Sequence, residues 1–146
     1  MGARRCRWWD TRAVIAHNVA ATGYDDGVAL ACFVHDERGD LVAGLEGFTW
    51  GGYAMVEWLW VREDHRGHGL GQRLVRSAEA EAQERGCRVL RVDTHTFQVP
   101  HFYSRLCYTV IGSAEDAPVG YAEVFFAKRL DPAPPAVGDE PAAYDR

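Results

Sequence analysis

Long apolar stretches and paired cysteines are both missing from this chain of 146 residues. A membrane-spanning helix needs about 18 consecutive apolar residues, and no such run occurs, so we expect no transmembrane segment and no membrane partner. No uninterrupted apolar stretch follows the N-terminal arginines, which argues against a secretory signal peptide. The four cysteines lie far apart, without a CxxC pair or the density of a disulfide framework. We therefore expect reduced thiols in a cytoplasmic protein.

Positive charge is also scarce. The chain has 16 Lys and Arg residues against 21 Asp and Glu residues, which gives a net charge of −5. The arginines of the segment Met1–Trp9 and the acids of the last sixteen residues offset one another, so the segment Asp10–Leu130 is acidic by itself. Binding to a phosphate backbone needs a basic face, so this composition excludes a general nucleic-acid partner and favours a cationic or neutral one.

The apolar content is that of one folded domain. Apolar residues make up 47% of the chain and aromatic residues 12%, which is enough for a hydrophobic core and excludes wholesale disorder. Four of the six prolines fall in residues 131–146, a segment that is also rich in Ala, Asp and Glu. Such a composition buries too little apolar surface to offset its ordering entropy. We therefore predict a folded domain over residues 1–130, followed by a disordered tail over 131–146.

Apolar periodicity and turn residues divide the domain into three helices and six strands. One helix follows an N-cap at Asp10 and ends near Gly23. The helix after the third strand carries one apolar stripe, and Gly86 follows as its C-cap. This order predicts a mixed α/β (α+β) fold with one mostly antiparallel sheet and helical crossovers, and it excludes a doubly wound Rossmann unit. After the first helix, the expected elements are strands 28–35, 41–50 and 54–61, helix 70–85, strand 89–93, helix 100–106, and strands 109–112 and 121–128.

A glycine-rich loop precedes the helix of residues 70–85. The sequence Arg66-Gly67-His68-Gly69-Leu70-Gly71 lets the backbone adopt positive φ angles and approach a ligand closely. Its N–H groups lie at a helix N-terminus, where negative charge is favoured, so the loop is a candidate phosphate site with Arg66 as a further cation. A glycine-rich surface turn is the alternative. A dinucleotide fingerprint would need glycine at Gln72, and the Gly-Lys-Ser/Thr sequence of a P-loop is absent.

Two motifs carry a family resemblance. The pattern Arg66-x-x-Gly69-x-Gly71, between a strand and a helix, resembles the R/Q-x-x-G-x-G/A pyrophosphate loop of the GNAT superfamily of acyl-CoA-dependent N-acyltransferases. The segment from Asp93 to Tyr108 is similar to the D-T-x-S-F-Q-A-P-x-F-Y-x-x-L-G-Y block of one branch of small bacterial acetyltransferases. The resemblance extends over about residues 28–130. Cys107 stands where that block has glycine, and Thr96 stands where the wider superfamily often has asparagine.

The resemblance implies a cofactor, a reaction and a set of binding residues. In this family the acyl-CoA lies in a V-shaped split between the fourth and fifth strands, and backbone N–H groups polarise the thioester carbonyl. A substrate amine attacks acetyl-CoA directly, without an acyl-enzyme, and the chain indeed shows no Ser/His/Asp or Cys/His arrangement. The implied pantetheine segment is Leu59, Trp60 and Val61, and the implied pyrophosphate loop is Arg66, Gly67, His68, Gly69, Leu70, Gly71, Gln72 and Arg73.

Tyr103 occupies the tyrosine position of the family's F-Y pair, which implies a general acid for the departing thiolate. A phenol with a pKa of about 10 is matched to that task. The alternative is a packing role, because Phe102, Tyr103 and Tyr108 lie at helical spacing and can form an aromatic cluster.

The candidate general base is predicted from the cross-strand pairing expected in the hairpin around Gly51 and Gly52. If Gly51 and Gly52 form an even-numbered turn, Glu46 lies directly across from Glu57 on the same face as Phe48 and Met55. Two carboxylates at that distance repel, so one pKa would rise and make Glu57, with Glu46 as its partner, the candidate base or ammonium site. An odd-length loop would separate the two. Alternatively, both lie on a solvated face, each paired with an arginine.

The acceptor is predicted from charge. Glu46 and Glu57, with Trp50 and Tyr53 nearby, favour a small, cationic and partly apolar primary amine held by charge and cation–π contacts. His95 can reach such an acceptor or bond a backbone carbonyl, and the histidines lack the neighbours that a metal site needs, so no metal is expected. Two other functions stay open: an acyl-CoA-binding module without catalysis, and a protein acetyltransferase acting on N-termini or lysines. Homodimers are common in such folds, and no sequence feature decides the oligomeric state.

Overall fold

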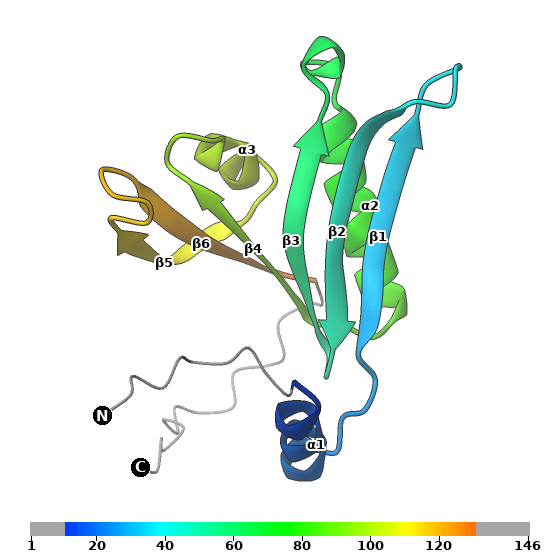
Figure 1. Cartoon of the computed structure of the whole chain (residues 1–146), viewed down its shortest axis with the longest axis vertical. Coiled ribbons are helices and arrows are strands. Elements are labelled where there is room, and N and C mark those ends of the chain that lie inside the picture. The colour runs from blue at the N-terminus through cyan, green and yellow to red at the C-terminus, as the bar shows by residue number, and fades with distance from the viewer. Residues whose placement is uncertain (1–10, 131–146) are drawn as a thin grey trace, which may run out of the picture.

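The computed structural model describes residues 11–130. The proposed N-cap Asp10 and the predicted tail of residues 131–146 lie outside the described residues. The described elements follow the predicted order (Figure 1). The strands that begin at Val89 and Thr109 extend beyond their predicted ends, to His95 and Glu115. They are α1 (Thr11–Thr22), β1 (Val28–His35), β2 (Leu41–Trp50), β3 (Tyr53–Val61), the short 3₁₀ helix η1 (Glu63–His65), α2 (Leu70–Glu84), β4 (Val89–His95), α3 (Pro100–Arg105), β5 (Thr109–Glu115) and β6 (Ala122–Arg129).

The strands form one sheet in the order β1-β2-β3-β4-β6-β5. Only β3 and β4 pair in parallel, and α2 is the crossover between them, as a parallel connection requires. The other pairs are antiparallel. The predicted mixed fold with a mostly antiparallel sheet and a helical crossover is therefore confirmed.

The core lies between α2 and one face of the sheet. The apolar stripe that was predicted for this helix is present. Its buried residues, which pack against apolar residues of β1–β4, are Leu74, Val75, Ala78 and Ala82. The opposite face of β1–β3 remains largely open, and it bears large exposed side chains. Phe33, Trp58 and Trp60 are 50%, 72% and 46% exposed.

The β2–β3 hairpin contains a bulge that the sequence arithmetic missed. The predicted register holds from Trp50–Tyr53 to Gly47–Val56 and includes the pair Phe48–Met55. It then shifts, so that Glu46 faces Trp58 and Glu57 is the extra, unpaired residue. The direct Glu46–Glu57 pairing is therefore wrong. Gly47 shows the local constraint, because a Cβ atom there would collide with the carbonyl oxygen of Met55.

The sheet opens into a V at this bulge. β3 and β4 pair only from Tyr53–Val89 to Val56–Val92, and Val56 directly precedes the bulged Glu57. Beyond this point β3 follows β2 and β4 follows β6, so the two halves of the sheet diverge (Figure 1). We call the β1–β2–β3 half the first arm and the β4–β6–β5 half the second arm.

A buried carboxylate connects the two arms. Glu79 of α2 is 7% exposed, and its Oε1 accepts hydrogen bonds from Tyr108 Oη (3.0 Å) and from Lys128 Nζ of β6 (2.9 Å). Arg76 Nη1 donates to its Oε2 at 2.9 Å. Burial, followed by the charge of Glu79, raises the pKa of Tyr108, so its hydroxyl remains a donor to the carboxylate. The network therefore fixes α2, which packs on the first arm, to the second arm.

The turn after α3 contains Cys107, where the block that this segment resembles has glycine. Cys107 is exposed and has a φ of 68°, in the left-handed region that favours glycine. The turn is closed by hydrogen bonds from Cys107 N to Ser104 O (3.1 Å) and from Tyr108 N to Tyr103 O (3.1 Å). The side chain therefore occupies a strained position.

We expect Cys107→Gly to stabilise the protein by about 0.5–1 kcal/mol, because relief of left-handed strain exceeds the added backbone entropy. Chemical denaturation measures this. Cys107→Ala removes the thiol but keeps the Cβ atom, so it should give no comparable gain. An equal gain in both variants would contradict the strain argument.

Candidate active site

The N-terminus of α2 lies at the wide end of the V and has no side-chain cap. Gly67 and Gly69 have φ angles of 77° and 80°, and a Cβ atom at either position would meet nothing within 4 Å. Gly69 is the N-cap and provides no side-chain cap, and the first turn contains no acidic residue. The first helical hydrogen bond runs from Arg73 N to Gly69 O (3.0 Å), so the N–H groups of residues 70–72 are available to a ligand.

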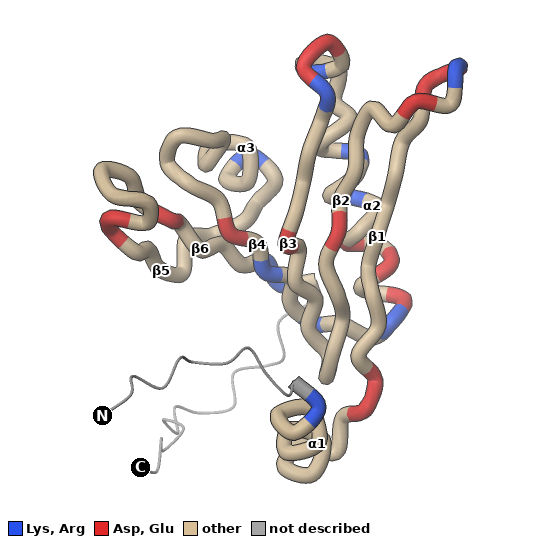
Figure 2. The backbone as a smooth tube through the Cα atoms, in the orientation of Figure 1, with Lys and Arg blue, Asp and Glu red and all other residues tan. Residues whose placement is uncertain are grey.

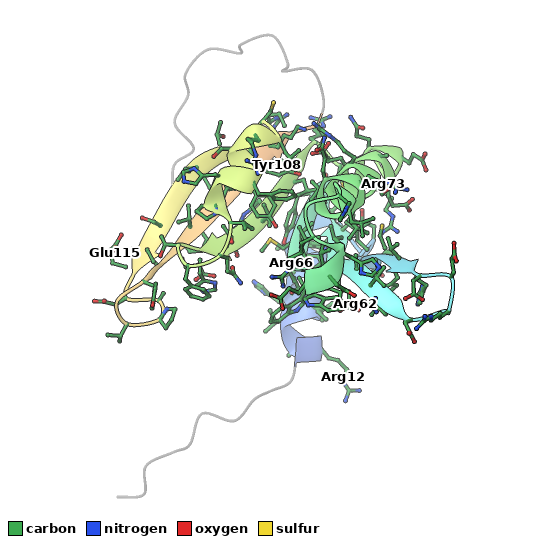
Figure 3. All side chains as sticks on the ribbon, turned by 90° about the horizontal axis from the view of Figure 1, so that it is seen from above. Arg12, Arg62, Arg66, Arg73, Tyr108 and Glu115 are labelled. Atoms are coloured by element: carbon green, nitrogen blue, oxygen red, sulfur yellow. The ribbon has the colours of Figure 1, made fainter. Side chains whose placement is uncertain are left out.

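Three arginines, Arg62, Arg66 and Arg73, lie around this N-terminus (Figure 3). They differ in whether a carboxylate already pairs with their charge. Arg62 is paired with Asp64 (2.7 Å) and Asp36 (3.5 Å). Hydrogen bonds from Arg62 and His65 lower the pKa of Asp64 to about 2, so this carboxylate stays charged. Arg66 Nε donates to the carbonyl of Val61 at 2.9 Å, which ties the loop to the end of β3. Within residues 11–130, no carboxylate forms an ion pair with Arg66 or Arg73, so these two can serve an anionic ligand.

The implied pantetheine segment presents its backbone to the V. Leu59 and Val61 pack against the core, whereas Trp60 points to the opposite, open face. Side chains that alternate in this way cannot line one channel together. Their shared feature is the β3 backbone edge beyond Val56, which β4 does not pair with. This edge offers N–H and C=O groups to an extended ligand arm.

Tyr103 lies on α3, on the second arm. It is 4% exposed and packs edge-on against Phe102 and Tyr108, with ring centroids at 5.0 and 5.8 Å. Burial raises its pKa to about 12, so the phenol remains protonated over the physiological range. The predicted aromatic cluster is therefore present, and the general-acid role of Tyr103 stays a prediction that its protonated phenol permits.

The first turn of α2 also lies close to α3. A Cβ atom at Gly71 would be 3.4 Å from Phe102 Cζ and 3.8 Å from Val61 Cγ2. Gly71 therefore allows α2, the end of β3 and the Phe102 ring to come together. The anion site and Tyr103 are brought into one region through Phe102.

Carboxylates lie on both arms beside the V, at the acidic positions of β2, β3 and β4 (Figure 2). Glu46 and Glu57 are exposed, and no described residue forms an ion pair with either, so arginine pairing is not observed. Trp50 and Tyr53 lie four residues farther along their strands, about 13 Å away by strand rise. The indole opposite Glu46 is that of Trp58 instead.

Asp93 is a site residue that the sequence reasoning did not single out. It directly follows Val92, the last β4 residue that pairs with β3. Its Oδ1 is buried without a hydrogen-bond partner, and the nearest cation is Arg91 Nη2 at 3.9 Å. Burial, with a smaller contribution from Glu123, raises its pKa, while Arg91 lowers it. The available signal was its place as the first residue of the D-T block.

The described chain shows neither a membrane-spanning helix nor a metal cluster. No helix in residues 11–130 is long and apolar enough to cross a membrane. Over the same residues, no three His, Cys, Asp or Glu side chains come together in a way that could hold a metal ion. His65 bonds Asp64 (2.8 Å), and the His95 ring stacks on Phe97. A hollow of about 530 Å³ lies beside α1, lined by Ile15, Phe48 and Trp50 among others, away from the α2 N-terminus.

Known proteins are similar to this chain in sequence and in fold. The Acetyltransferase (GNAT) family matches residues 4–108. The blasticidin-S acetyltransferase of Streptomyces morookaense is 41% identical over 101 residues, which cover 68% of this chain and 74% of that protein. Acetyltransferase Atu2258 of Agrobacterium fabrum strain C58 is 32% identical over 117 residues, covering 80% of this chain and 85% of that protein. The crystal structure of an acetyltransferase from Bacillus cereus matches with a TM-score of 0.77 and 30% identity, covering 88% of this chain and 94% of that one.

The chain belongs to the GNAT family of acetyltransferases. It is an acyltransferase, and the resemblance inferred from its two motifs is confirmed. The split that the resemblance places between the fourth and fifth strands of the family corresponds to the divergence of β3 and β4, the third and fourth strands of the described chain.

We expect Gly69→Ala to raise the KM for acetyl-CoA about tenfold, because its methyl group intrudes where a phosphate approaches the α2 N-terminus. Steady-state kinetics measures this. Gly86→Ala is the matched control at the other end of α2: its φ is 79° and its Cβ position is equally open. Both variants should lose about 1 kcal/mol of stability from left-handed strain. An equal KM change in the two would contradict the assignment.

Proposed function

We propose that this chain transfers an acetyl group from acetyl-CoA directly to the primary amine of a small, cationic acceptor. One observation carries the proposal: the V between β3 and β4 has an uncapped helix N-terminus at one arm and a buried, protonated tyrosine at the other. The first suits the pyrophosphate of a CoA thioester. The second suits a thiolate leaving group.

The proposed cofactor contacts follow from the free groups of the first arm. The N–H groups of residues 70–72, with Arg66 and Arg73, hold the pyrophosphate. The unpaired β3 edge over residues 57–61 hydrogen-bonds the pantetheine arm. A backbone N–H of this edge also polarises the thioester carbonyl, as an oxyanion hole does. Thr96, which stands where the wider superfamily often has asparagine, accepts the backbone N–H of Ala122 at its Oγ1 (3.1 Å).

The proposed chemistry is a single displacement. The neutral amine nitrogen attacks the thioester carbon, the C–S bond breaks, and the amide forms. Tyr103 donates its proton to the departing thiolate, and Glu57 accepts the proton that the amine loses. Glu57 is suited to this role because the bulge leaves it exposed at the opening of the V, where no described cation neutralises it. Glu46, on the neighbouring strand, adds negative charge that attracts the ammonium form of the acceptor.

The proposed acceptor follows from the acids on both arms and from the relative that is named for blasticidin S, a small molecule. The cytoplasmic location, the folded domain 1–130 with its tail, and a homodimeric state remain predictions from the sequence. A protein acceptor is a second outcome that the same assay distinguishes.

Thiol release from acetyl-CoA in the presence of amines tests the proposal. Wild type should release thiol with small cationic amines, and Tyr103→Phe should lower kcat about 100-fold while the KM for acetyl-CoA changes little. The protonated phenol is the active form, so its activity is lost only as the pH rises through about 12. The wild-type kcat should therefore show no falling limb from Tyr103 below pH 10.5.

Tyr108→Phe is the matched control, because it removes a second buried hydroxyl, 5.8 Å away between ring centroids. It should cost about 1 kcal/mol of stability through the lost Glu79 hydrogen bond and leave kcat unchanged.

Glu57→Gln should lower kcat/KM most at low pH, where the amine arrives protonated. Tight CoA binding without thiol release from any amine would overturn the proposed function, and release with peptides alone would overturn the small acceptor.

A further inference from the structure

An aromatic cluster continues from the second arm beyond Asp93. The side chains of Arg91, Asp93 and His95 lie on the same, less buried face of β4. Glu123 of β6 pairs directly with His95. The His95 and Phe97 rings stack at 5.1 Å with an interplanar angle of 18°. Tyr121 meets Phe97 edge-on at 5.1 Å. We call His95, Phe97 and Tyr121 the aromatic corner.

The aromatic corner is exposed but firmly held. Phe97 is 54% exposed and Tyr121 50%. Thr96 joins the loop to the start of β6 through a hydrogen bond from its N–H to Ala122 O (2.9 Å) and another from Ala122 N to its Oγ1 (3.1 Å). Gln98 Oε1 accepts hydrogen bonds from Thr94 Oγ1 and from His95 N, both at 3.0 Å. These hydrogen bonds, made by polar residues of the D-T-x-T-F-Q block, hold the loop so that its aromatic rings are rigid at the protein surface.

The charge beside the corner is negative. Asp93 has a buried oxygen without a hydrogen-bond partner, and the Glu123 side chain forms no hydrogen bond or ion pair with any described residue. Among residues 11–130, the cation paired with Asp93 is Arg91, whose Nη2 lies 3.9 Å from Asp93 Oδ1. Rings beside carboxylates attract a cation through both its charge and its contact with the π faces.

The position of the corner relates it to the acceptor. Asp93 and Glu57 directly follow the last paired residues of β4 and β3, so both lie where the V opens. His95 lies two residues farther along β4, about 7 Å away by strand rise. A single extended acceptor can therefore reach from an amine beside Glu57 past Asp93 to the corner.

We propose that the aromatic corner, with Asp93 and Glu123, binds a planar cationic group of the acceptor, such as a guanidinium or a protonated heterocycle, while the amine that is acetylated lies beside Glu57. This assignment rests on the proposed function and specifies its substrate class. A planar cation stacks on a ring and presents its N–H groups to a carboxylate at the same time, which a tetrahedral ammonium does less well.

Two amines of similar length test the assignment in the thiol-release assay. Agmatine carries a primary amine and a guanidinium joined by a butyl chain. Cadaverine carries two primary amines joined by a pentyl chain, so that an ammonium takes the place of the guanidinium at similar length. Wild type should show a kcat/KM for agmatine about tenfold above that for cadaverine. Phe97→Leu and Tyr121→Leu should each lower the agmatine value about fivefold and change the cadaverine value less than about twofold.

Phe33→Leu is the matched control, because Phe33 is 50% exposed on β1, at the outer edge of the first arm. It should change neither value. Equal rates with the two amines in wild type, or equal losses for both amines in the ring variants, would overturn the planar-cation assignment while leaving the acetyltransferase proposal intact.

Calorimetry with agmatine in the presence of CoA separates the two proposals. If neither amine releases thiol, agmatine binding that Phe97→Leu weakens still supports the corner, and the proposed reaction alone fails. Absence of agmatine binding to the CoA-bound wild type overturns the corner.

Discussion

The bulge at Glu57 is the feature on which the rest of the site depends. Gly47 approaches the backbone of Met55 so closely that no larger residue fits, and the extra residue in β3 follows immediately. A bulge bends and twists its strand, and pairing with β4 ends at Val56. This frees a backbone edge of β3 for a cofactor arm and leaves Glu57 exposed at the opening. The crossover α2 then places its uncapped N-terminus beside Val61 at the wide end of the same V, and Glu79 fixes the two arms together.

Much of this arrangement could be predicted because it is encoded locally. Glycines and alternating apolar residues define the β2–β3 hairpin, and Leu70 opens α2 as its apolar stripe indicated. The positive φ angles before α2 were predicted because such angles at a helix start favour glycine, here Gly67 and Gly69. Tyr103 was found through its motif, although its burial between α3 and the second arm is a tertiary property.

The remainder depends on contacts that sequence spacing does not contain. The pairing predicted from the turn assumed that β2 and β3 pair without a bulge. It therefore could not show that Glu46 pairs with Trp58. Asp93 and Glu123 are distant in sequence and come together only because β6 inserts beside β4. The aromatic corner likewise needs the β5–β6 hairpin to bring Tyr121 to Phe97. These are residues of the proposed acceptor side, whereas the proposed cofactor side lies in one continuous stretch of the chain from β3 to the start of α2.

Hydrogen–deuterium exchange with and without CoA tests the central claim, that the V between β3 and β4 holds the acyl-CoA. The account predicts slower exchange over residues 57–61 and 67–73 on adding CoA, and unchanged exchange over β5. Protection confined to the hollow beside α1, with residues 57–61 and 67–73 unaffected, would contradict it.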